Sequence, residues 1–255
     1  MIDLDTYLVE AEKALMTLLK EWHPKLMAHF GEDKYSVKTD KTVVTELDKE
    51  LELAIKDVLR PLSPEVGFWG EEHGKEGPED IFWFVDPIDG TELYIRGLDG
   101  CRTLLCLMMN DEPVYAFAYK FVTGELYKAQ KGKGTTKNGK PVHITNHELS
   151  RAWVEGSLDM RNPKAVEALL KVSAAVNAVL YTKEFLRVLD GFADAHIISG
   201  AGGPWDYAPR ALLMKEAGAK VSNIGSDTYD YKNLTLLAAS PGIFDALHKL
   251  LSIEA

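Results

Sequence analysis

Apolar residues recur at steps of three and four along the first sixty positions, which is the period of an amphipathic helix. The first set predicts one long helix, which Pro24 and then Gly31 are expected to end or kink. Its members are Leu4, Leu8, Ala11, Leu15, Leu18, Leu19 and Trp22. A second helix is expected from Thr45 to about Arg60, where Pro61 stops it. Its buried side comprises Leu47, Leu51, Ile55, Val58 and Leu59.

Short apolar runs replace this pattern after residue 65 and predict strands. Two of them, Val66–Trp69 and Ile81–Val85, end abruptly in carboxylates. Three more are expected to form an antiparallel meander. They are Thr103–Met109, Val114–Phe121 and Glu125–Gln130, with turns at Asn110-Asp111, Thr123-Gly124 and Lys137-Asn138-Gly139-Lys140.

The last hundred residues alternate between strand-like and helix-like segments. The expected strands are Ala152–Glu155, Val179–Thr182, Ala195–Ile198 and Leu236–Ala239. The expected helices are Pro163–Val176, Phe185–Phe192, Tyr207–Ala217 and Ile243–Leu251. The pattern predicts an α+β half over residues 1–145 and a layered α/β half over residues 146–255.

Charge and cysteine content narrow the function classes. Thirty-nine acidic and 29 basic residues give a formal net charge of −10, which argues against nucleic-acid binding. An anionic substrate could still bind through metal cations. The two cysteines, Cys101 and Cys106, are five apart in an apolar run, so on a strand they would point to opposite faces. With no signal peptide and no membrane span in the sequence, a cytoplasmic location is expected.

The strongest chemical signal is the segment Phe84-Val-Asp86-Pro-Ile-Asp89-Gly-Thr91. Two carboxylates this close repel each other unless a cation lies between them. Oxygen ligands suit Mg²⁺, and the Ile88 carbonyl could add another. A helix that opens at Gly90 and Thr91 would offer its free N–H groups to a phosphate. An ordinary Asx-type turn explains the spacing equally well.

A second acidic motif, Gly70-Glu71-Glu72-His73-Gly74, follows another predicted strand. Such a loop is often only a solvated surface turn. Two strand ends that both present carboxylates nevertheless favour a metal site.

Taken together, these motifs resemble the three-part signature of the inositol monophosphatase superfamily of lithium-sensitive, Mg²⁺-dependent phosphatases. The matching runs are GEE (70–72), VDPIDGT (85–91) and WD (205–206), preceded by a K-x-D-x-x-x-V-T-x-x-D pattern over residues 38–48. The resemblance covers nearly the whole chain. It implies a layered αβαβα sandwich of the inositol monophosphatase and fructose-1,6-bisphosphatase type, and a cytoplasmic enzyme that is often a dimer.

The resemblance also implies a ligand set for two or three Mg²⁺ ions, with Mn²⁺ as a substitute. Glu71, Asp86 and the Ile88 carbonyl would hold the first ion. Asp86, Asp89 and Asp206 would hold the second, and Glu71 would reach a weaker third ion through water. These ions would supply a hydroxide for in-line attack on phosphorus and would stabilise the leaving oxygen.

Roles in catalysis and substrate binding follow from the same resemblance. Asp48 and Thr91 would help to deprotonate the attacking water, and the amides of Gly90 and Thr91 would bind the phosphate. Asp206 and Ser199 would lie on the substrate side. Two of these residues have simpler explanations, since Thr45-x-x-Asp48 is also a helix capping box and Asp206 could be a helix N-cap.

The sequence departs from the family at three segments beside these motifs. Thr-Asn-Phe after DGT is replaced within Glu92–Gly97, and Pro209-Arg210 stands where Ala-Gly is usual. An acidic residue expected near Ser199 is absent. The predicted substrate is therefore a small polyol or sugar phosphate, with histidinol phosphate and 3′-phosphoadenosine 5′-phosphate as alternatives. A weakly active relative that only binds a phosphorylated metabolite is an alternative from another class.

Overall fold

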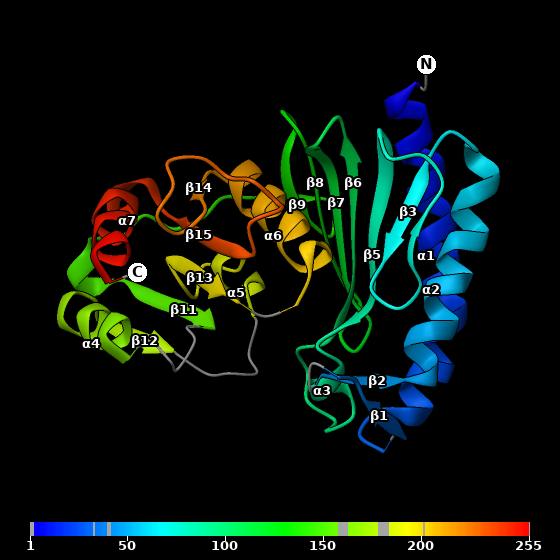
Figure 1. Ribbon diagram of the computed structural model, residues 1–255, viewed down its shortest axis with the longest axis horizontal. Helices are drawn as coiled ribbons and strands as arrows, with labels where there is room; N and C mark the ends of the chain where they lie inside the picture. Colours follow the sequence, from blue (N-terminus) through cyan, green and yellow to red (C-terminus); the bar gives the residue numbers. More distant parts are fainter. Residues whose placement is uncertain are drawn as a thin grey trace. The chain divides into compact units, whose positions relative to one another are not determined.

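The computed structural model describes residues 3–32, 34–39, 42–157, 163–177, 184–200 and 202–254. They form two compact units, Met1–Leu126 and Tyr127–Ala255. Figure 1 shows the elements of both units. The layout of the predicted site depends chiefly on the first unit.

Unit 1 contains the two long helices that the apolar periodicity predicts. They are α1 (Leu4–His29) and α2 (Glu46–Leu59), and a 3₁₀ turn (Arg60–Leu62) follows α2. Helix α1 ends at His29, just before Gly31, as expected, and it continues through Pro24, the other residue that was expected to end or kink it. Tertiary contacts hold the turn beyond it: Leu26 is buried, and its carbonyl accepts a hydrogen bond from the Tyr94 hydroxyl at 2.6 Å.

The strands of unit 1 form a sheet with the order β4-β3-β5-β6-β7. Their bounds are β3 (Gly67–Gly70), β4 (Gly74–Glu76), β5 (Ile81–Asp89), β6 (Arg102–Met109) and β7 (Glu112–Lys120). Strand β3 runs parallel to β5, and the other neighbours are antiparallel. A separate pair, β1 (Tyr35–Val37) and β2 (Val43–Thr45), precedes α2.

Helices α1 and α2 cover one face of this sheet (Figure 1). The core between them consists of alternate strand residues and the apolar stripes of the helices. From the sheet it includes Trp83, Val85, Leu105, Leu107 and Phe117, all fully buried. The residues between these positions on each strand, such as Phe84 and Asp86 on β5, therefore belong to the opposite face.

Strand β5 contains a β-bulge at its carboxyl end. Asp86 pairs with Leu104 and Asp89 with Arg102, so three steps along β5 oppose two along β6. One extra residue in a strand resets the alternation of side chains. The strand that the sequence predicted over Ile81–Val85 therefore extends to Asp89, because pairing with β6 resumes there after the bulge.

Unit 2 contains a set of hairpin strands and a five-stranded sheet. The hairpin strands are β8 (Glu125–Gln130), which begins at the end of unit 1, β9 (Gly134–Lys137) and β10 (Lys140–Val142). The sheet has the order β12-β11-β13-β15-β14. Its members are β11 (Trp153–Ser157), β12 (Ala175–Asn177), β13 (Ala195–Ser199), β14 (Lys220–Ser222) and β15 (Thr235–Ala239).

The described residues of unit 2 include four helices, and the first and last of these share a core with the sheet. They are α4 (Pro163–Val172), α5 (Leu186–Leu189), α6 (Pro204–Glu216) and α7 (Pro241–Glu254). Leu169 of α4 and Leu247 of α7 pack with the inward residues of β11, β13 and β15. A 3₁₀ turn, Leu149–Arg151, precedes β11.

Several predicted segments of unit 2 differ from the observed ones. The helix expected over Pro163–Val176 ends at Val172, because Ala175–Asn177 pairs with β11 as a parallel strand. The helix expected over Phe185–Phe192 is only Leu186–Leu189. The strand expected over Val179–Thr182 lies outside the described residues.

The expectation that Cys101 and Cys106 do not form a disulfide is confirmed, since both are free and buried. Within the part of the chain that the structure describes, no helix is long and apolar enough to cross a membrane.

Candidate active site

The bulge in β5 places Asp86 and Asp89 on the same side of the strand. Without the extra residue, side chains three positions apart would point to opposite faces. One carboxylate oxygen of each residue instead lies within 4.8 Å of the other's. The two residues are only 2% and 1% exposed, so like charges meet where water screens them little. Such a pair needs a positive partner.

Glu71 lies beside Asp86 because of the register between two parallel strands. Gly70 on β3 pairs with Val85 on β5, and the Glu71 amide donates to the Val85 carbonyl at 3.0 Å. Glu71 and Asp86 are therefore the next residue on each strand, at the edge where the carboxyl ends of parallel strands meet. The carboxylates near this edge therefore come from two separate motifs, Glu71 from one and Asp86 and Asp89 from the other.

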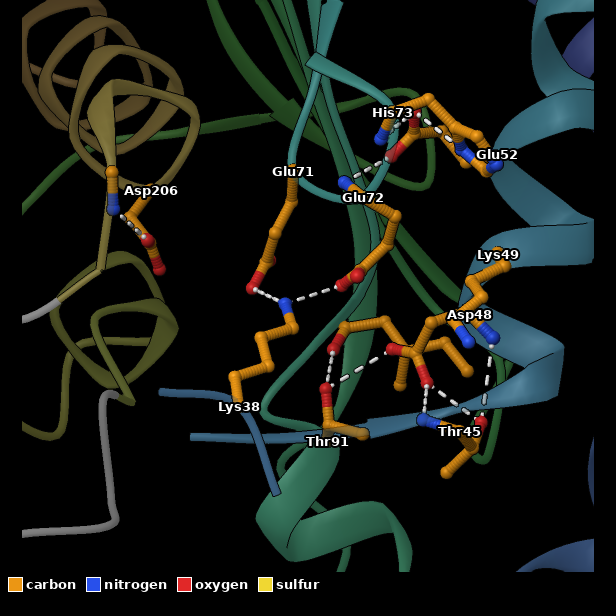
Figure 2. A network of polar contacts seen from close by, with 12 residues as sticks. Lys38, Thr45, Asp48, Lys49, Glu52, Glu71, Glu72, His73, Thr91 and Asp206 are labelled. Atoms are coloured by element: carbon orange, nitrogen blue, oxygen red, sulfur yellow. Dashed lines mark hydrogen bonds and ion pairs between the residues drawn. The ribbon is translucent and has the colours of Figure 1, made fainter. Parts of the chain in front are cut away.

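Lys38, which follows β1, contacts both acidic residues of the loop after β3. Its ammonium lies 2.9 Å from Glu71 Oε1 and 2.7 Å from Glu72 Oε1 (Figure 2). Burial acts to lower the pKa of Lys38, but the two carboxylates outweigh it and hold that pKa above its usual value. The Lys38 and Glu71 side chains are 23% and 22% exposed, so this ammonium can move aside for another cation.

Asp48 connects the start of α2 to the turn after β5. One of its carboxylate oxygens accepts hydrogen bonds from the Thr45 amide and hydroxyl, at 2.8 and 2.6 Å. The other accepts from the Thr91 hydroxyl at 3.1 Å (Figure 2). The Thr91 hydroxyl also lies 3.0 Å from the Ile88 carbonyl. The capping box that the sequence predicted and the pairing of Asp48 with Thr91 that the family resemblance implies are thus both present.

Burial is the main influence on Asp48. It raises the pKa of this carboxyl to about 6, although hydrogen bonds from Thr45 act in the opposite direction. A carboxylate with a pKa near neutrality is a better proton acceptor than an ordinary aspartate.

For the phosphatase reaction that the family resemblance implies, we expect the rate to fall as the pH drops through about 6. Asp48 becomes protonated there, and a protonated carboxyl cannot accept the proton of the Thr91 hydroxyl. The measurement is kcat from pH 4.5 to 8.5. Phosphate monoesters titrate near pH 6 as well, so the profile of Asp48→Asn serves as the reference. Identical profile shapes for the two proteins would contradict the role of Asp48.

No motif in the sequence indicated Glu52, which lies one turn beyond Asp48 on the buried stripe of α2. Its carboxylate accepts hydrogen bonds from the amides of Glu72 and His73, at 2.8 and 3.1 Å (Figure 2). It also pairs with Lys56 at 2.9 Å, with both side chains at most 2% exposed. A Cβ on Gly70 would lie 2.0 Å from the Glu52 carboxylate, so only glycine fits there. One helix face therefore positions both Thr91 and the loop that carries Glu71.

Glu52→Gln is expected to destabilise the protein by roughly 3–5 kcal/mol, because Lys56 would be left as a buried charge without its counter-ion. The measurement is urea unfolding at pH 7. Glu46→Gln, which removes an exposed pair with Lys49 from the same helix, should change stability by less than about 1 kcal/mol.

The double variant Glu52→Gln/Lys56→Met removes both charges and should recover part of the lost stability. A Glu52→Gln variant as stable as the wild type would show that this pair does not hold the loop.

Gly90 is the N-cap of α3 (Thr91–Tyr94), and its φ of 86° lies in the left-handed region that favours glycine. The helix that the sequence predicted at this point exists but has only four residues. The first amides of a helix have no partner within it. Gly90 and Thr91 are thus placed where an anion could approach the turn that carries Asp86 and Asp89.

In unit 2, Asp206 lies in the first turn of α6 as its third residue. The N-cap is Gly203, whose amide donates to Asp206 Oδ2 at 2.8 Å, so the alternative that Asp206 is itself the N-cap is wrong. Its other oxygen lies 3.2 Å from the buried Arg210 guanidinium. Ser199 is the last residue of β13 and is partly exposed.

A second buried arginine, Arg102 at the start of β6, was not indicated by any sequence motif. Arg102 is the direct cross-strand partner of Asp89, and its Nε lies 2.8 Å from Asp89 Oδ2. A basic residue at the start of an apolar strand gives no sign of such a contact, because the contact depends on the register with β5.

The carboxylates of unit 1 fit a divalent cation at Glu71 and Asp86. They are hard oxygen donors at one sheet edge, and the Ile88 carbonyl lies in the bulge between Asp86 and Asp89. The Lys38 ammonium, which an ion would displace from Glu71, belongs to a partly exposed side chain. Asp89 fits less well, because a buried guanidinium already neutralises it.

Comparison with known proteins gives the same family that the sequence motifs suggest. The sequence matches the inositol monophosphatase family over residues 4–253. The Nus factor SuhB of Xylella fastidiosa is 31% identical over 196 residues, which cover 72% of this chain and 70% of that protein. The inositol monophosphatase of Dictyostelium discoideum is 28% identical over 267 aligned positions, covering 98% and 96% of the two chains. The chain belongs to the inositol monophosphatase family.

The solved structures confirm the predicted fold class. The inositol monophosphatase of Thermotoga maritima matches with a TM-score of 0.83 and 25% identity, over 93% of this chain and 95% of that one. Members of the family are metal-dependent phosphatases, so this chain is a hydrolase of phosphate monoesters.

Proposed function

We propose that the protein hydrolyses the phosphate monoester of a small polyol or sugar in a reaction that requires Mg²⁺. The observation that carries this proposal is the contact between Asp48, Thr91 and the Ile88 carbonyl, beside the buried pair Asp86 and Asp89. It joins a proton acceptor to the cation-binding turn. A protein that only bound phosphate would not need this acceptor.

In this proposal Glu71, Asp86 and the Ile88 carbonyl hold the cation. When bound, Mg²⁺ would lower the pKa of a coordinated water and polarise a phosphoryl oxygen. Asp48 orients the Thr91 hydroxyl and accepts its proton, and the hydroxyl in turn accepts a proton from the attacking water. Burial of Asp48 keeps its basicity suited to neutral pH.

Other residues would bind the substrate. The amides of Gly90 and Thr91 would donate hydrogen bonds to the phosphate, and Ser199 and Asp206 would face the alcohol part. An acidic residue expected near Ser199 is absent, so hydrolysis of a phosphate monoester is better supported than specificity for inositol phosphate. The resemblance further suggests a homodimer and inhibition by Li⁺, and we retain both as proposals.

The test is phosphate release from a panel of substrates with Mg²⁺, with EDTA and with added Li⁺. The panel contains inositol phosphates, sugar phosphates including fructose 1,6-bisphosphate, histidinol phosphate and 3′-phosphoadenosine 5′-phosphate. Release from polyol or sugar phosphates in Mg²⁺ supports the proposal. Preference for either of the last two would replace the substrate class, and binding without any release would favour a binding protein.

A further inference from the structure

Both aspartates that were expected to complete the second cation site are paired with buried arginines. In unit 1, Arg102 and Asp89 are 0% and 1% exposed, with 2.8 Å between Nε and Oδ2. In unit 2, the Arg210 and Asp206 side chains are 0% and 4% exposed, with 3.2 Å between Nη2 and Oδ1. The two pairs arise independently, one across two strands and one along a helix turn.

The backbone fixes the first pair. Asp89 and Arg102 are directly opposite each other where β5 resumes pairing with β6 after the bulge. Directly opposed side chains in an antiparallel pair are close enough to touch. The guanidinium cannot turn toward solvent, since no part of Arg102 is exposed. It also cannot lose its charge, because arginine remains protonated in proteins.

The second pair stands at one of the sequence departures. Arg210 is four residues after Asp206 on α6, which places it on the same helix face. It occupies the position where the family commonly has a small residue.

Lys38 at Glu71 provides a contrast. Its ammonium is a mobile point charge on a flexible stem, and the side chain is 23% exposed. A divalent cation can displace it toward water. The same cation at Asp89 would have to remain beside a fixed positive charge in a poorly screened place.

We propose that Arg102 and Arg210 are the permanent counter-ions of Asp89 and Asp206, and that the protein binds one divalent cation per chain where two or three were expected. The cation is the one at Glu71, Asp86 and the Ile88 carbonyl. Arg102 supplies beside Asp89 the positive charge that a second ion would otherwise bring. This inference rests on the proposed function, since it assumes the first cation site.

The test is the number of Mn²⁺ ions bound per chain, measured by the electron paramagnetic resonance of free Mn²⁺ without phosphate present. The wild type is expected to bind one ion, with any second ion at least about tenfold weaker. Arg102→Met should strengthen the second ion about tenfold or more. Arg60→Met, which removes an exposed pair with Glu76, should bind as the wild type does.

Arg102→Met leaves Asp89 without its counter-ion, so its folding is followed by circular dichroism and by its Tm with and without Mn²⁺. A larger rise in Tm with Mn²⁺ than the wild type shows is expected. Arg102→Lys keeps a charge on a more mobile group and provides a second, better-folded variant, in which the second ion should also bind more tightly than in the wild type.

Two ions of similar affinity in the wild type, or an unchanged count in both Arg102 variants, would overturn this inference and leave the proposed function intact. A wild type that binds no Mn²⁺ and releases no phosphate in Mg²⁺ would overturn the proposed function as well.

Discussion

Asp86→Asn is expected to lower kcat by at least about 10³-fold without unfolding the protein. Asp86 lies at the sheet edge, between the loop that carries Glu71 and the bulge that carries Asp89. The asparagine side chain has the same shape but lacks the negative charge that holds a cation. A bound metal contributes several kcal/mol to the stabilisation of transition-state charge, and each 1.36 kcal/mol is tenfold in rate. The measurement is phosphate release at saturating Mg²⁺.

Asp80→Asn is the matched control, because Asp80 precedes the same strand but is exposed. It should retain wild-type activity. If Asp86→Asn also remained active within a factor of three or so, the first cation site would be wrongly assigned.

Thr91→Val is expected to lower kcat by roughly 10²- to 10⁴-fold, the range for loss of a positioned acid–base group. Valine has nearly the same shape but lacks the hydroxyl that lies between Asp48 and the Ile88 carbonyl. KM should change much less than kcat, since the backbone amides at Gly90 and Thr91 remain. The measurement is a full Michaelis profile for each variant.

Thr91→Ser retains the hydroxyl and should recover most of the activity. Thr17→Val, on the exposed side of α1, removes a hydroxyl that bonds only locally and should have no effect. Equal losses for Thr91→Val and Thr91→Ser would mean that the methyl group, and not the hydroxyl, is what the site requires.

Local signals in the sequence predicted the elements that local interactions decide. The capping box at Thr45 and Asp48 spans three residues, and it is present. The turn at Asn110-Asp111 was predicted too, and both residues adopt the positive φ that a tight hairpin needs. The apolar stripes of α1 and α2 likewise needed only their own spacing.

Features that depend on a distant partner could not be predicted in this way. The bulge between Asp86 and Asp89 exists only relative to β6, which begins thirteen residues later. Ala175–Asn177 continues a helical pattern by itself and becomes a strand because β11 lies beside it.

Buried charges were the main omission at the site. Glu52 and Lys56 lie on a helix whose polar positions look like a solvated face, and nothing in their spacing shows that they are buried. The importance of Arg102 and Arg210 depends on their ion pairs with Asp89 and Asp206, which the sequence does not show. The motifs indicated the acidic residues, but they could not show which of these residues form ion pairs with a buried arginine.

We expect this protein to release phosphate from a monoester only when a divalent cation is bound. The most direct measurement is phosphate release by protein that has been stripped with EDTA and dialysed, before and after Mg²⁺ is added back. The stripped wild type is expected to release no phosphate and to recover fully with Mg²⁺, whereas Asp86→Asn should not recover. Release that continues unchanged in EDTA would contradict this expectation.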